Sequence, residues 1–378
     1  MASNRFHRSF RVSISAVVAV AFVFLSPIGA EPIDAQSTPA SAVLGRAAWD
    51  AIRSGRVDEA AETFRQAIAI DQRDGGLFLG AGLAAHLLGR TAEARRALEQ
   101  ALQIDPRLTN AALLLGEIAY RDGDLQSAIR TYEEALSRTP ANSQLQDKLA
   151  RWRREASLHD SFARRISDHF TVLFEGPPEQ STAELALQIL EAAYWRIGAS
   201  VSSYPSEPVT VVLYSQEQFR DITRSPQWAG GLFDGNIRVP VRGALEQRDE
   251  LQRVLTHEFT HALIWAVGPR AVPTWLNEGL AVLFEGENLD WATRRLQSAH
   301  QRFALSDLHR PFSNLNAEQA AVAYAESGLA VHALVERIGG GGVGGLLQEL
   351  ARGTAFDATF QRFALISYAD FQNQRAEQ

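Results

Sequence analysis

The sequence predicts two folded parts in tandem: an all-α repeat array, followed by a domain of the α+β class. The first half repeats small residues at a fixed interval of 34 positions, for example at Gly55, Gly89 and Gly123. From Phe170 onward, short apolar runs typical of strands alternate with longer patterns of helical period. At 378 residues the chain is long enough for two domains with cores of their own.

The composition is ordinary for a globular protein and excludes some classes of function. Hydrophobic residues make up 46% of the chain, charged residues 21%, and the formal net charge is −7. A negative balance argues against nucleic acid as a main partner, because binding to phosphates needs a basic surface. The chain has no cysteine, so disulfides, thiolate chemistry and cysteine metal ligands are excluded.

Residues 1–30 have the pattern of an export signal. Arg5, Arg8 and Arg11 form a basic start, and residues 12–25 follow without a charge. This apolar run is shorter than the roughly 20 residues that span a bilayer, and small residues ending at Ala30 suit a cleavage site. We expect secretion across the inner membrane into the periplasm; an uncleaved membrane anchor is the alternative. Residues 31–42, rich in Pro, Ser and Ala, are expected to be a linker.

Residues 43–165 are expected to form helical repeats closed by a capping helix. One large residue per repeat keeps the 34-residue step, at Phe64, Leu98 and Tyr132. Small Gly and Ala would let paired helices approach each other, and the large residue would fill the space between repeats. The period resembles the tetratricopeptide repeat, which consists of paired helices. Residues 142–158, helical in pattern and strongly charged, would cap the stack.

The concave side of such an array is a candidate binding surface. Its inner helices would present Trp49, Leu83, His86 and Tyr120, which could hold an extended peptide or a protein partner. The alternative is that this side only packs against the neighbouring domain. We expect His86 to be a packed histidine rather than a ligand.

Residues 166–378 are expected to form the α+β domain. Strands are predicted at Phe170–Phe174 and Val209–Tyr214, and residues 232–240 fit two strands about a tight turn. Residues 339–345 are rich in glycine but lack the Lys-Ser/Thr of a phosphate loop, so we expect a loose connection between helices. Helices are predicted at residues 181–197, 215–222, 290–303, 317–338 and 345–351.

Residues 251–286 carry the residues with the most specific chemistry. His257 and His261 stand four positions apart in a segment of helical period, so both side chains project from one face. Two neutral imidazoles so placed can each give a nitrogen to one zinc ion, with Glu258 beside the water on the metal. A zinc site of this kind needs a third protein ligand, and Glu278 on the following helix is the candidate.

A family resemblance rests on these residues. His257-Glu258-x-x-His261, followed by Trp275-Leu276-Asn277-Glu278-Gly279, resembles the gluzincin metallopeptidases, in particular the peptidase MA-like domains. The resemblance implies a zincin-like domain with a small mixed sheet, active-site helices and a helical C-terminal part. It also implies a Zn²⁺ cofactor and Glu278 as the third ligand.

Two features differ from the alanyl-type aminopeptidases, which share the W-L-N-E-G core. Sixteen residues separate His261 from Glu278, whereas those enzymes have eighteen. Their G-x-M-E-N strand, which holds a substrate amino terminus, is absent because Met1 is the only methionine. Aminopeptidase activity is therefore not expected.

The resemblance points to further elements of the site. Tyr324 and Ser327 match a Tyr-x-x-Ser element of peptidase MA-like domains, and Tyr324 could donate a hydrogen bond to the oxyanion of the tetrahedral intermediate. The alternative is a helix tyrosine packed in the core. In gluzincins the last strand before the histidine helix pairs with the extended substrate; residues 229–232 are our candidate, with a glycine-rich turn as the alternative. The position four after Glu278, acidic in thermolysin-like enzymes, is Val282, so the groups that orient the two histidines stay open.

The expected activity is that of a zinc metallopeptidase, an endopeptidase of the bacterial cell envelope acting on peptides or proteins. Zinc would polarise the scissile carbonyl and acidify water, and Glu258 would pass that water's proton to the leaving amine. Two alternatives stay open: a catalytically silent peptidase fold that serves as an assembly or binding module, and hydrolysis of something other than a peptide. His300, His309 and His332 lie outside any motif and are expected to be structural or surface residues.

Overall fold

The structure is a computed structural model that describes most of the chain after the expected export signal. The predicted signal, residues 1–30, lies outside the described residues. The described ranges are 39–223, 230–241, 245, 247–268, 272–286, 288–312, 315–352 and 354–376.

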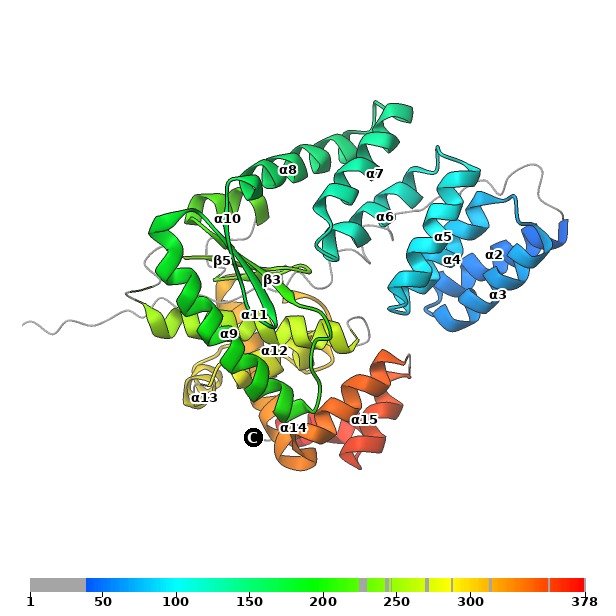
Figure 1. Ribbon diagram of the computed structural model, residues 1–378. Coiled ribbons are helices and arrows are strands. Elements are labelled where there is room, and N and C mark those ends of the chain that lie inside the picture. Colours follow the sequence, from blue (N-terminus) through cyan, green and yellow to red (C-terminus); the bar gives the residue numbers. More distant parts are fainter. Residues whose placement is uncertain are drawn as a thin grey trace, which may run out of the picture.

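The first half is an array of three helix pairs followed by a longer helix, α8 (Ser143–Asp160), as predicted (Figure 1). Asn142 caps α8 by accepting a hydrogen bond from the backbone of Leu145 at 3.0 Å. The paired helices are α2 (Pro39–Arg53) and α3 (Val57–Ile70), α4 (Gly75–Leu87) and α5 (Thr91–Ile104), and α6 (Thr109–Arg121) and α7 (Leu125–Arg138).

Small and large residues fit together within and between the helix pairs, but the close contacts are not at Gly55, Gly89 and Gly123, which instead follow the first helix of each pair with a φ of 75°, 76° and 78°. A Cβ built at Gly80 would lie 2.2 Å from the ring of Phe64, and one at Gly116 would lie 2.3 Å from the ring of Tyr132. Both rings are fully buried. Only glycine lets the large side chain of one helix reach the backbone of its neighbour at these points.

The residues predicted to face a peptide on the concave side are instead mostly packed within the array. Trp49, Leu83 and His86 are all less than 10% exposed. Trp49 lies edge-on to Phe64, with ring centroids 5.4 Å apart. Tyr120 reaches out of the array and contacts the second domain. The expectation that His86 is packed is confirmed, but these four side chains offer no open peptide groove.

A five-stranded mixed sheet forms the centre of the second domain, with strand order β1-β2-β3-β5-β4. The outer pairs, β1 with β2 and β4 with β5, are antiparallel, and the inner pairs are parallel. The predicted strands and the hairpin are present, whereas β1 was not predicted. The strands are β1 (Ala163–Ile166), β2 (Phe170–Phe174), β3 (Val209–Tyr214), β4 (Leu232–Phe233) and β5 (Ile237–Pro240).

Helices cover both faces of this sheet. On one face, Phe170, Ile237 and Phe259 belong to a core that α9 (Gln180–Val201) and α11 (Arg248–Val267) share with the C-terminal helices. On the other face, a smaller cluster that includes Val212 and Tyr214 packs against α10 (Gln216–Thr223) and against Leu158 at the end of α8. The C-terminal end of the capping helix thus packs on one face of the sheet together with α10 (Figure 1).

The two domain boundaries fall slightly earlier than expected. Helix α2 begins at Pro39, within the stretch 31–42 that was expected to be a linker. Strand β1 begins at Ala163 and pairs with β2, so the sheet domain starts before the expected boundary at 165/166.

The C-terminal part is helical, as predicted, but its glycine-rich stretch is not a loose connection. Helix α14 (Ala317–Ala351) kinks at Gly339, where φ is 72°, and then continues as helix. A Cβ at Gly340 would lie 2.3 Å from the carbonyl oxygen of Ser200, and one at Gly344 only 1.8 Å from that of Val201. The glycines therefore allow α14 to pack directly on the end of α9.

The remaining helices are α12 (Thr274–Phe284), α13 (Asp290–Gln297), α15 (Phe356–Ala364) and α16 (Tyr368–Ala376). Helix α13 is shorter than the predicted 290–303. In the part of the chain that the structure describes, no helix combines the length and the apolar character needed to cross a membrane.

Candidate metal centre

Two helices bring the predicted metal ligands together. His257 and His261 lie one turn apart on α11, and α12 places Glu278 opposite them. Gly279 sets the position of α12, because a Cβ there would lie 2.3 Å from the carbonyl oxygen of Ser327 on α14. The glycine after the glutamate thus lets α12 lie close between α11 and α14.

The three side chains have the spacing of ligands around one ion. Nε2 of His257 and Nε2 of His261 each lie 3.5 Å from Oε2 of Glu278, and the candidate ligand atoms all lie within 4.8 Å of one another. Zinc bonds of about 2.1 Å at tetrahedral angles place neighbouring ligands roughly 3.4 Å apart. All three residues are nearly fully buried, and these three atoms have no protein hydrogen bond. The residues therefore fit a zinc ion.

Each histidine is oriented by a side chain of α12 or of its end. Nδ1 of His257 lies 2.6 Å from Oε1 of Glu285, and Nδ1 of His261 lies 3.0 Å from Oδ1 of Asn277. With the proton on Nδ1 donated to these oxygens, the lone pair of each Nε2 faces Glu278. This arrangement fixes the tautomer that a metal ligand requires.

Glu285 is the orienting residue that sequence reasoning missed. The position four after Glu278 holds Val282, which is buried and packs against Gly328 on α14. Glu285 lies seven positions after Glu278, two helical turns along the same face. Testing the two-turn spacing as well as the one-turn spacing could have found it.

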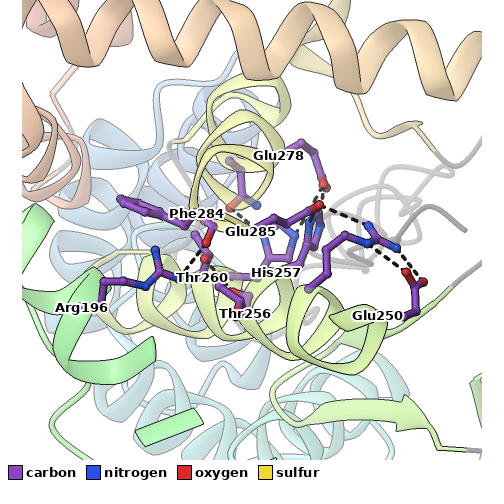
Figure 2. A network of polar contacts seen from close by, with 11 residues as sticks. Arg196, Glu250, Thr256, His257, Thr260, Glu278, Phe284 and Glu285 are labelled. Carbon is purple, nitrogen blue, oxygen red and sulfur yellow. Dashed lines mark hydrogen bonds and ion pairs between the residues drawn. The ribbon is translucent and has the colours of Figure 1, made fainter. Parts of the chain in front are cut away.

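Arg253 holds Glu285 from the other side. Its Nη1 lies 3.2 Å from Oε2 of Glu285, and its Nη2 lies 2.7 Å from Oε1 of Glu250. Figure 2 shows this chain of contacts from His257 through Glu285 to Glu250. Burial disfavours the charged form of Arg253, but Glu285 and Glu250 raise its pKa, so the guanidinium stays a cation. Glu285 is therefore held on both sides.

The electrostatics of the centre favour a positive charge. Burial works to lower the pKa of His257, but the neighbouring carboxylates of Glu278 and Glu285 raise that pKa to about 10. Burial works to raise the pKa of Glu278, whereas the charge of His261 and the proximity of both imidazoles lower it to about 2. Glu278 is thus a carboxylate at neutral pH, as a metal ligand must be.

Glu258 lies beside the beginning of the edge strand. It is 0% exposed, and a Cβ built at Gly231 would lie 2.8 Å from its Oε1. Gly231 directly precedes β4, the strand at the edge of the sheet. Of the predicted substrate-pairing stretch, Ala229 lies outside the described residues, while Leu232 begins that edge strand. Glycine at position 231 therefore permits a close approach between Glu258 and the residue before the edge strand, whereas the predicted pairing of residues 229–232 with a substrate stays a prediction.

Tyr324 lies against the centre from α14. It is 2% exposed, and its ring centroid is 6.2 Å from that of His257. Burial raises the pKa of its hydroxyl, and the negative charges of Glu278 and Glu258 raise it further, so Tyr324 is a neutral hydrogen-bond donor. Ser327, one turn later, is fully buried. His309, one of the histidines outside any motif, does not belong to this centre. Its Nε2 lies 2.9 Å from the hydroxyl of Tyr368.

Comparison with known families agrees with this architecture. Residues 191–369 match the family model of the Peptidase MA superfamily. The second domain is a Peptidase MA superfamily domain. Residues 46–109 and 85–151 match two models of the tetratricopeptide repeat, so a tetratricopeptide-repeat array precedes the Peptidase MA domain. No curated protein matches the chain.

Solved structures similar to the chain are tetratricopeptide-repeat domains. The first repeat domain of Spaghetti (RPAP3) bound to an HSP90 peptide is 20% identical, covering 31% of this chain and 95% of its own, with a TM-score of 0.30. The first such domain of human RPAP3 is 22% identical, with coverages of 32% and 96% and a TM-score of 0.30. The Sgt2 domain from Aspergillus fumigatus is 19% identical, with coverages of 38% and 95% and a TM-score of 0.32.

A substitution outside the ligand set tests the orienting role of Glu285. Glu285→Ala removes the oxygen that accepts the Nδ1 proton of His257, and zinc affinity should fall about 10–100-fold. Titration with zinc against a competing chelator measures this. Glu250→Ala is the matched control, because Glu250 contacts the same Arg253 but neither histidine. Wild-type zinc affinity in Glu285→Ala would contradict the assigned role.

Proposed function

We propose that the chain is a zinc-dependent peptidase, acting as an endopeptidase in the bacterial cell envelope. The observation that carries the proposal is the buried His257, His261 and Glu278 group with its 3.5 Å spacings, with Glu258 next to the start of the edge strand. Two imidazoles, one carboxylate and water form a ligand set that zinc accepts well.

The residues of the chain divide the chemistry among them. His257, His261 and Glu278 would hold the zinc ion, which when bound supplies a Lewis acid that polarises a carbonyl and acidifies water. Glu258 accepts a proton from the attacking water and returns it to the leaving amine nitrogen. Tyr324 donates a hydrogen bond from its hydroxyl to the carbonyl oxygen as negative charge develops there.

The sheet edge supports a peptide as the substrate. Among the described strands, β4 has one neighbour, β5, so it lies at the edge of the sheet. An extended peptide that pairs there would run past Gly231 and Glu258. Endopeptidase activity fits the lack of a G-x-M-E-N strand, which would otherwise hold a free amino terminus. The repeat array is the proposed site for a protein or peptide partner.

The cellular location is proposed from residues 1–30 alone. The mature protein in the cell envelope should lack them, because the apolar run and the small residues before Glu31 form a cleavable signal. Amino-terminal sequencing of the protein from cell fractions measures this. An intact amino terminus in the cytosol would contradict export.

A peptide-library digest tests the proposed activity. The zinc-loaded protein should cut internal bonds, lose this activity on chelation, and regain it when zinc is added back. Glu258→Gln serves as the control for contaminating proteases. If neither protein cuts any peptide while the wild type binds zinc, the chain would instead be a silent peptidase fold that acts as a binding module.

A further inference from the structure

A buried arginine joins the repeat array to the peptidase domain. Arg238 lies on β5 and is 0% exposed, with its side chain on the sheet face that α8 covers. Its Nε lies 2.9 Å from Asp234 in the β4–β5 turn, and its Nη1 lies 2.6 Å from Glu155 on α8. One carboxylate partner thus comes from each domain.

Two tyrosines complete the network around Arg238. Its Nη2 donates to the hydroxyl of Tyr120 on α6 at 2.7 Å, and its Nη1 donates to that of Tyr214 at 2.8 Å. Tyr120 in turn donates to Glu155 at 2.8 Å. A buried guanidinium is stable only when acceptors bind its N–H groups and negative groups balance its charge. Tyr120 and Glu155 of the array provide part of both, so they are essential to the position of Arg238.

His159 on α8 stays neutral at this junction. Its Nε2 lies 2.7 Å from the hydroxyl of Tyr214, and burial, together with the charge of Arg238, lowers its pKa to about 4. His159 therefore adds no positive charge beside Arg238 near neutral pH.

A second contact joins the array to the same hairpin. Gly235 lies at the tip of the β4–β5 turn with a φ of 111°, and a Cβ there would lie 2.2 Å from the carbonyl oxygen of Arg121. The guanidinium of Arg121 lies over the ring of Trp265 on α11, 5.4 Å from its centroid. The end of α6 therefore contacts both the hairpin and the helix that carries the histidines.

The β4–β5 hairpin contacts Glu258 through the glycine that precedes it. Gly231 precedes β4 and packs on the Glu258 side chain, while Arg238 pairs with Leu232 across the hairpin. A shift of the hairpin would therefore change the position of the edge strand relative to Glu258, whereas the three candidate metal ligands lie on α11 and α12 and not on the hairpin.

We propose that Arg238 is a positioning residue, through which the third repeat and its capping helix hold the β4–β5 hairpin in register for substrate binding. The array is then a structural part of the substrate site and not an independent module. The role in substrate binding rests on the proposed peptidase function, whereas the anchoring of the hairpin does not.

Substitutions within the array test this. Tyr120→Phe and Glu155→Gln each remove hydrogen bonds to a charged partner without a large change of shape. Amide hydrogen exchange in residues 232–240 should become about tenfold faster or more, the scale on which such bonds act. For cleaved peptides, KM should rise while kcat and zinc content hold. Tyr132→Phe is the control, because its hydroxyl bonds only within the array, to Glu117 at 3.1 Å and to Leu113 at 3.3 Å.

Two outcomes would overturn the proposal. One is hairpin exchange at the wild-type rate in both variants, and the other is an equal increase in Tyr132→Phe. Hydrogen exchange needs neither zinc nor a substrate, so it decides whether the hairpin is anchored even if no peptide is cut. Failure of the proposed peptidase function would show separately, as a zinc-loaded wild type without cleavage.

Discussion

Glu258→Gln should lower peptide hydrolysis by about 10²–10⁴-fold, the usual loss when a general base is removed. Glu258 lies between the two histidines in sequence, is 0% exposed and faces Gly231 at the edge strand. Gln has nearly the same size, so α11 should keep its packing. It has no basic carboxylate, so it cannot accept the proton of the attacking water. Steady-state kinetics on a peptide from the library digest measures the effect.

Zinc content and melting temperature serve as controls for Glu258→Gln. Both should match the wild type, because Glu258 is not among the residues whose atoms converge at 3.5 Å. Wild-type rates of hydrolysis in this variant would show that the proposed mechanism is wrong.

Glu278→Gln should abolish both zinc binding and hydrolysis. Oε2 of Glu278 is the atom that lies 3.5 Å from both Nε2 atoms, and a neutral amide is a much poorer zinc ligand than a carboxylate. The loss of charge also removes the group that favours a cation beside His257. Metal analysis after dialysis and the same peptide assay measure the two effects.

The contrast between the two glutamates separates binding from chemistry. Glu258→Gln should keep its zinc and lose the reaction, whereas Glu278→Gln should lose both. Glu250→Gln, which changes an acidic residue that contacts Arg253 and no metal ligand, should lose neither. Retention of zinc by Glu278→Gln would remove this residue from the ligand set.

Local patterns were enough to predict most elements of the fold. The 34-residue step of glycine reflects a local feature that recurs in every helix pair, the turn after its first helix, where Gly55, Gly89 and Gly123 have a φ of 75°, 76° and 78°. The strands Phe170–Phe174 and Val209–Tyr214 are apolar because they are buried in the sheet. Strand β1 was missed because Arg164 and Arg165 lie within an edge strand that exposes every second residue.

The grouping of His257, His261 and Glu278 could also be predicted, because helical spacing and a short motif fix their positions. Glu285 does not follow from the family spacing, because it lies two turns and not one turn after Glu278. The helical glycines near Gly344 look like a loop in sequence, because only the backbone of α9 reveals why side chains are excluded there.

The junction around Arg238 could not be predicted from local patterns. Its partners Glu155 and Tyr120 lie 83 and 118 positions away in sequence, and each is an unremarkable polar residue on its own helix. They become candidates for a functional role because the fold brings them together around Arg238. This depends on how α6 and α8 pack against the sheet. Such a network is a property of the tertiary structure alone.

Metal analysis of the purified mature chain beside His261→Ala tests the central claim most directly. Nε2 of His261 faces Glu278 at 3.5 Å, and alanine removes this ligand without adding bulk to the core. The wild type should hold about one zinc ion per chain, as a site with three protein ligands implies, and His261→Ala should hold little or none. Equal zinc in the two proteins would contradict the metal centre described above.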